Sequence, residues 1–107
     1  MNGLKGIKVE WKNDGNDSAT LTLNMTFVKD VATVEDMDGD IIINRNNVVW
    51  RKNFSHSSKN LEGQVTATAT DGTIFSFFWS CYAVWEDFGG YRLVRIDNFK
   101  VHDIDWE

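Results

Sequence analysis

The chain has 107 residues and a mass of 12.3 kDa, which leaves room for one domain, residues 1–107, and for no second one. Its 42% hydrophobic and 25% charged residues exclude a disordered chain, and its formal net charge of −5 disfavours nucleic acid and membrane surfaces as partners. A basic partner is electrostatically favoured.

The first predicted strands form a long hairpin. In residues 7–12, IKVEWK, apolar and charged side chains alternate, as they do in a strand with one buried face. A cluster of turn-forming residues follows at 13–17, and the alternation resumes from Ala19 to Phe27. The two runs are therefore expected to pair.

The next part of the chain has short runs on either side of an acidic loop. A short strand is predicted at 31–34, and the segment VEDMDGD at 34–40 follows it as a hairpin loop. Residues 41–43 are three isoleucines, which do not alternate with polar residues and therefore predict burial on both faces. A turn at 45–47 leads to a strand at 48–54.

The second half begins with a polar loop at 55–60. Further strands are predicted at 61–70, 73–85, 91–96 and 99–106.

The dipeptide Asp71-Gly72 predicts a two-residue hairpin turn, because both positions tolerate a positive φ. This turn sets a register in which one face pairs polar with aromatic residues: Gln64 with Trp79, Thr66 with Phe77, and Thr68 with Phe75. Such a face is either covered by a neighbouring layer or lines a ligand cavity.

Together these runs predict an all-β fold, an antiparallel meander of about eight strands that is either a closed barrel or a β-sandwich. The chain contains no proline, a residue that often prevents an edge strand from pairing with another molecule. This favours the closed barrel.

The acidic loop first suggests a calcium site. An EF-hand loop that starts at Asp36 needs glycine after Asp40 and glutamate at its twelfth position, but the chain has Ile41 and Asn47 there. A loose carboxylate site for a cation, a solvated turn and an acidic recognition face remain as alternatives. Our interpretation is a recognition face, and we predict no metal.

The sequence contains no recognisable catalytic constellation, so we expect a non-enzymatic protein without a cofactor. Cys81 lies in an aromatic run, where a thiol is expected to be a small buried hydrophobe. Neither His56 nor His102 lies in a motif that ties it to a nucleophile. The opening residues lack the apolar segment of a signal peptide, and the chain has a single cysteine, which together predict a cytoplasmic location.

Acidic residues lie beside aromatic ones at three places, and we predict that they form a partner-binding surface. The charge would accelerate the encounter with a cationic protein, and the aromatic side chains would anchor it. The predicted contact residues are Glu35, Asp36, Asp38, Asp40, Glu86, Asp87, Asp103, Asp105 and Trp106.

With its small size, its acidic balance, its Trp-rich body and the corners VEDMDGD and WEDF, the chain resembles the small cytoplasmic immunity proteins of bacterial toxin systems, including contact-dependent growth inhibition. The resemblance implies an antitoxin that neutralises a basic, nuclease-type toxin domain by covering part of its surface. It rests on overall character and assigns no role to any single residue.

The alternative function is a small-ligand or carbohydrate-binding β-barrel. Its ligand would lie against the aromatic side chains of Phe75, Phe77, Trp79 and Trp85.

Overall fold

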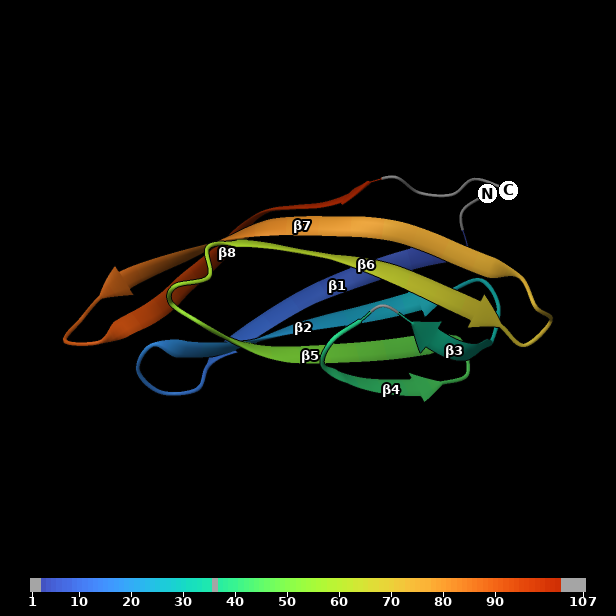
Figure 1. Ribbon diagram of the computed structural model, residues 1–107, viewed down its shortest axis with the longest axis horizontal. Helices are drawn as coiled ribbons and strands as arrows, with labels where there is room; N and C mark the ends of the chain where they lie inside the picture. The colour runs from blue at the N-terminus through green and yellow to red at the C-terminus, as the bar shows by residue number, and fades with distance from the viewer. Residues whose placement is uncertain (1–2, 36, 103–107) are drawn as a thin grey trace.

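The computed structural model describes residues 3–35 and 37–102, which form eight antiparallel β-strands in two four-stranded sheets (Figure 1). The first sheet contains, in spatial order, β1 (Leu4–Asn13), β2 (Ser18–Phe27), β5 (Asn47–Ser55) and β4 (Asp40–Asn44). The second contains β3 (Val31–Glu35), β6 (Asn60–Ala69), β7 (Ile74–Asp87) and β8 (Tyr91–His102). Within the described residues, no helix is long and apolar enough to cross a membrane.

The prediction of an all-β, antiparallel fold is confirmed, whereas the closed barrel that the lack of proline favoured is wrong. The two sheets stay separate and pack as an open β-sandwich. Their edges are protected by other means. The edge strands β3 and β4 have only five residues each, and the edge strand β1 carries three exposed lysines.

The strands do not form one continuous meander. The hairpins β1–β2, β4–β5, β6–β7 and β7–β8 are present, but the chain crosses from one sheet to the other after β2, after β3 and after β5. The acidic segment therefore connects the two sheets, and the hairpin loop predicted for it is wrong. Alternation of apolar and polar residues identifies a strand, but it does not indicate which sheet the strand joins.

The β6–β7 turn has one residue more than predicted. The N–H of Gly72 donates to the carbonyl of Ala69 (2.9 Å), and the N–H of Ala69 donates to the carbonyl of Thr73 (2.7 Å). Three residues thus separate the paired positions 69 and 73, with Gly72 at a φ of 89°. This is the geometry of a three-residue hairpin loop that ends in a left-handed residue.

The longer turn shifts the predicted register by one residue. Phe75 pairs with Ala67 and Phe77 with Val65, so small and aromatic side chains share one buried face. Thr66 and its threonine neighbours lie on the opposite face of β6. The predicted face that combines threonines with aromatic residues is therefore wrong.

Aromatic pairs fill the space between the sheets along the long axis of the molecule. In each pair, one ring comes from β2 or β5 and the other from β7. The pairs are Phe27 with Phe75, Trp50 with Trp79, and Phe54 with Trp85, with ring centroids 6.0, 5.3 and 5.5 Å apart. The inward side chains of β2 are also buried, as its alternating sequence predicts.

Two local predictions are wrong because of strand position. β4 is an edge strand, so the isoleucines at 41–43 are not buried on both faces, and Ile42 is 57% exposed. Between residues 91 and 102 the chain forms one strand, β8, where separate strands at 91–96 and 99–106 were predicted, because a bulge containing Asn98 at a φ of 54° lets the pairing with β7 continue. Residues 103–106 of the second predicted strand lie outside the described residues.

The short strands β3 and β4 flank only one end of the sandwich. β4 pairs with residues 47–51 of β5, and β3 pairs with residues 66–69 of β6. Residues 52–55 of β5 still pair with β2, and residues 60–65 of β6 still pair with β7. On the side where β3 and β4 lie, however, no strand of the described chain flanks them. We call the flanked part the covered end and the other part the open end.

The opposite long side of the sandwich is joined by a side chain. Nδ2 of Asn13 on β1 donates to the carbonyl of Leu93 on β8 (3.0 Å), and the N–H of Leu93 donates to Oδ1 of Asn13 (2.8 Å). The amide thus links the two sheets in the way that a backbone pair links two strands. At the open end, therefore, the β1–β8 side of the sandwich is closed by these hydrogen bonds, whereas the β3–β4 side is open.

Candidate functional site

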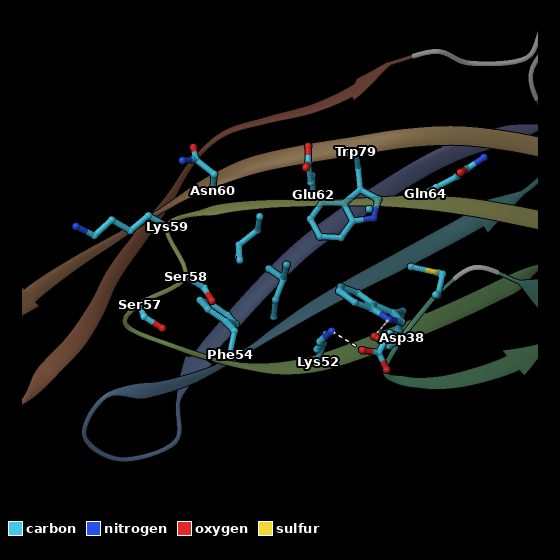
Figure 2. A pocket seen from close by; sticks show the side chains of 15 residues that line it. Asp38, Lys52, Phe54, Ser57, Ser58, Lys59, Asn60, Glu62, Gln64 and Trp79 are labelled. Atoms are coloured by element: carbon cyan, nitrogen blue, oxygen red, sulfur yellow. Dashed lines mark hydrogen bonds and ion pairs between the residues drawn. The ribbon is translucent and has the colours of Figure 1, made fainter.

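A cavity of about 660 Å³ opens between the sheets at the open end (Figure 2). Small-molecule sites usually have volumes of about 300–1,000 Å³, so this cavity is large enough for a ligand. We call it the window. Its border consists of the end of β5, the loop 56–59, the start of β6 and the acidic loop at 37–38.

The floor of the window is apolar and belongs to the core. It contains Leu21, Trp50, Phe54, Leu61 and Trp79. The two indole rings are tilted by 57° with respect to each other, and these tryptophans are only 4% and 3% exposed. The window therefore ends on two rings that are almost fully buried and held in place by packing.

The indole N–H of Trp79 differs from those of Trp50 and Trp85. Nε1 of Trp50 donates to the carbonyl of Asp38 (3.2 Å), and Nε1 of Trp85 donates to the carbonyl of Ser58 (3.1 Å). Nε1 of Trp79 is buried and has no hydrogen-bond partner within the described chain. A buried donor without an acceptor costs about 1–3 kcal/mol. Among the described residues, the other such side-chain atom is Nδ1 of His56, which lies 3.8 Å from a carboxylate oxygen of Asp17.

Gly63 makes the position of this indole possible. A Cβ at residue 63 would lie 2.7 Å from Nε1 of Trp79 and 2.8 Å from its Cε2, which is closer than non-bonded atoms approach. Any side chain there would displace the ring or fill the window beside its N–H edge. A glycine within a strand often marks such a close approach.

The charges at the rim balance. Nζ of Lys52 donates to Oδ2 of Asp38 (2.8 Å), and this hydrogen bond lowers the pKa of the Asp38 carboxyl. Lys59 and Glu62 add one charge of each sign. The rim thus has no net charge, and its only ion pair within the described chain is that of Lys52 with Asp38, drawn as a dashed line between the two labelled side chains in Figure 2.

The acidic loop, predicted as a partner-binding surface, lies beside the window. Glu35 ends β3 and Asp40 begins β4, and both are exposed. Basic residues of β5 lie next to two of the loop's carboxylates, because Lys52 binds Asp38 and Arg51 is paired across the strands with Asp40. The local field of the loop is therefore weaker than the sequence indicates.

The other predicted contact residues are not brought to this loop. Glu86 and Asp87 are exposed at the end of β7, at a tip of the molecule far along its axis from the β3–β4 connection (Figure 1). Oδ1 of Asp87 accepts hydrogen bonds from the N–H groups of Gly89 and Gly90, at 3.0 and 3.2 Å, so it stabilises the β7–β8 turn. The remaining predicted contacts, Asp36, Asp103, Asp105 and Trp106, lie outside the described residues.

Of the four aromatic residues predicted to line a ligand site, Trp79 lines the window. Phe75 and Phe77 are buried between the sheets. Trp85 is half-buried and packs edge-on against Phe54.

Cysteine and histidine chemistry does not contribute to the window. Cys81 is buried, as predicted, and burial raises the pKa of its thiol to about 11, which keeps it protonated at neutral pH. His102 lies 3.2 Å from the hydroxyl of Ser80 on the surface, and His56 stacks on Tyr91 with ring centroids 4.3 Å apart. No group of three or more His, Cys, Asp or Glu side chains in residues 3–35 and 37–102 could hold a metal ion.

Sequence reasoning missed the other members of the window, above all Trp50 and Gly63. The available signal was the glycine in the middle of the predicted strand at 61–70, because an interior glycine often indicates a close approach to its backbone. The pairing of Trp50 with Trp79 had no signal, since it depends on how the two sheets stack.

Comparisons of the chain with protein-family models, with curated proteins and with solved structures found no match.

Proposed function

We propose that the protein is a non-enzymatic binding protein and that the window holds a small ligand. The observation that carries the proposal is the cavity of about 660 Å³ between the sheets, with its apolar floor and polar rim. A cavity of this size, lined by apolar side chains and open to solvent at a polar rim, is typical of a small-molecule site.

The rigidity of the floor also supports binding. Leu21, Trp50 and Trp79 project from central parts of the two sheets, and their side chains are fixed by packing before any ligand arrives. A preformed site loses little conformational entropy when it binds.

The chemistry of the rim favours binding over catalysis. Its titratable side chains are Asp38, Lys52, Lys59 and Glu62, and the lysine beside Asp38 keeps that carboxylate ionised. None of them forms the pair of nucleophile and base that covalent catalysis uses.

Titration of 15N-labelled protein with a mixed panel of charged and uncharged small molecules tests the proposal. We expect some members to shift the indole signal of Trp79 and the amide signal of Gly63 together and saturably. If no compound moves these two signals in the folded protein, the window is not a ligand site.

A second candidate function is the immunity role that the resemblance implies, and the WEDF corner favours it. Phe88 is 67% exposed beside the carboxylates of Glu86 and Asp87. Exposed aromatic and acidic groups side by side suit the capture of a cationic protein, in this case a basic toxin domain.

Co-expression with the neighbouring reading frame tests the second candidate. A basic partner should co-purify at low salt, and Glu86→Lys should slow its association and flatten the salt dependence, while Glu10→Lys on β1 serves as the charge-matched control. Equal association rates for both variants would show that the WEDF segment does not contact the partner.

A further inference from the structure

We propose that the edge of β6 beside the window pairs with an extended segment of another polypeptide, and that two apolar side chains of this segment enter the window. The segment lies antiparallel to residues 60–64, which span about 13 Å between the loop 56–59 and the acidic loop. The inference rests on the proposed function and names the class of the ligand.

The direction of the backbone groups of β6 is the first reason. At one end of the β6–β7 pair the N–H of Ala83 donates to the carbonyl of Lys59, and at the other the N–H of Ala69 donates to the carbonyl of Thr73, both at 2.7 Å. The register between these ends is regular, so the odd-numbered residues of β6 bond to β7 and the even-numbered ones face the side on which β3 lies. Beside the window the even-numbered residues are Asn60, Glu62 and Gln64.

Beyond the end of β3 these backbone groups have no strand to bond to. β3 pairs with β6 only at residues 66–69, and no hydrogen bond within residues 3–35 and 37–102 occupies the N–H or C=O groups of the three even-numbered residues. Asn60 and Glu62 are exposed, so a strand can reach both. An antiparallel strand exchanges two hydrogen bonds with each such residue.

This edge also lacks the features that protect the other edges of the sandwich. The edge strands β1, β3 and β8 each pair with an irregularity, and β4 has only five residues. Residues 60–65 contain no lysine and no proline, and their pairing with β7 is regular. On β5 only residues 52–55 are unflanked, and the carbonyl of Ser55 already accepts from the N–H of Ser58 (2.9 Å). β6 therefore offers an incoming strand the longer regular edge.

The side chains of β6 determine which residues the segment carries. Leu61 and Gly63 lie on the inner face of β6 and line the window, whereas Figure 2 shows Asn60 and Glu62 pointing away from the space between the sheets. Residues directly opposite each other in an antiparallel pair face the same side, so the positions opposite Leu61 and Gly63 point into the window. Leu61 and Met37 are only half-buried there, which leaves apolar surface to cover. Both positions of the segment are therefore apolar.

Charge complementarity sets the residue between these two positions. Glu62 is exposed and forms no ion pair with any described residue. The residue opposite it lies on the outer face, where a lysine or arginine pairs favourably with its carboxylate. The segment thus has the pattern apolar–basic–apolar, and its backbone supplies the alternating donors and acceptors that the edge requires.

Titration of 15N,13C-labelled protein with a capped pentapeptide, Thr-Val-Lys-Val-Thr, tests the inference. We expect it to shift the amide signals of Asn60 and Glu62 and the methyl signals of Leu61 together and saturably. The Glu62 amide should also exchange more slowly with solvent, because its N–H becomes hydrogen-bonded. The same peptide N-methylated at its lysine loses a donor to the edge and should bind about 10-fold more weakly.

A charge swap identifies the register. Glu62→Lys should weaken binding of the lysine peptide by roughly 3- to 10-fold and should bind Thr-Val-Glu-Val-Thr more tightly than the wild type does. The matched control is Glu10→Lys, because Glu10 is exposed on β1 and does not line the window. This control should bind both peptides as the wild type does. An equal effect of the two substitutions would overturn the pairing opposite Glu62.

The outcomes separate the inference from the proposed function. If small molecules shift the Gly63 amide and no peptide shifts Asn60 and Glu62, the inference is overturned and the window remains a ligand site. If neither kind of compound shifts these signals, both are overturned. If the peptide shifts the edge amides but not the Leu61 methyls, it binds outside the window and the inference fails. If the edge amides shift with protein concentration alone, the occupant is a second copy of the chain, which also overturns the inference.

Discussion

The covered end and the open end of the sandwich are filled by the same kind of residue and differ in what flanks them. At the covered end, Phe27 and Phe75 stack with an interplanar angle of 18°, and β3 and β4 close the side of the sandwich. At the open end, Phe54 and Trp85 fill the same layer with their ring centroids 5.5 Å apart, but both flanking strands have ended. The difference teaches that aromatic residues between two sheets border an open cavity when the edge strands beside them are short.

The largest expected effect concerns the covered end. Phe27→Ala removes a ring that is fully buried, and we expect a loss of about 3–5 kcal/mol in the free energy of unfolding, measured by urea denaturation. The loss reflects lost apolar burial and the cavity left behind. A loss under about 1 kcal/mol would show that this end packs no more tightly than the window does.

The next effect concerns the open end. Gly63→Ala places a methyl group against the Trp79 indole, and we expect a loss of about 1–3 kcal/mol together with a change in tryptophan fluorescence. Gly6→Ala is the matched control, since a Cβ at residue 6 meets nothing within 4 Å. Equal stability and equal fluorescence of the two variants would contradict the close packing of residue 63 against the ring.

A smaller effect is expected at the closed long side. Asn13→Ala removes both hydrogen bonds to Leu93 and leaves a partly buried N–H and C=O without this partner, which should cost about 1–2 kcal/mol. Asn44→Ala, at an exposed position at the end of β4, should change the free energy of unfolding by less than about 0.5 kcal/mol. Similar values for the two variants would mean that the Asn13 side chain does not hold the sheets together.

The smallest effects are those of exposed carboxylates at the two ends. The pKa of Asp71, beside the covered end, is lowered by its hydrogen bond from Lys29, and the pKa of Asp38, at the window, by its hydrogen bond from Lys52. A lowered pKa in the folded state gives stability that is present above the unfolded value of about 3.9 and is lost as the pH falls through the folded value.

Thermal unfolding between about pH 2 and pH 7 checks this expectation. Asp71→Asn and Asp38→Asn should each lower the melting temperature slightly at neutral pH and leave it close to that of the wild type in acid, so that the decline between the two becomes smaller. An unchanged acid decline in both variants would show that these carboxylates do not contribute to it.

The sequence predicts the strands well, because alternation is a local property. The hairpin of β1 and β2 and the buried face of β2 follow from residues that lie next to one another in the chain. The β6–β7 register was missed, since Asp71-Gly72 suits a two-residue turn and a three-residue turn alike. One residue in that turn decides whether Phe75 faces threonine or alanine.

The window could not be predicted from the sequence, because it results from where strands end relative to one another in space. Its acidic rim was recognised through the residues of the loop, but the basic residues that neutralise part of it come from β5. Trp79 was singled out as one of four aromatic residues, and only the stacking of the two sheets separates it from Phe75 and Phe77.

The geometry of Trp50 and Trp79 also gives the protein an optical signature of its own. With centroids 5.3 Å apart and rings tilted by 57°, the electronic transitions of the two indoles couple and contribute a pair of circular dichroism bands of opposite sign. Since one ring belongs to each sheet, the signal is lost as soon as the sheets separate. The unlabelled molecule therefore carries a spectroscopic reporter of sheet docking, independent of whether the individual hairpins have formed.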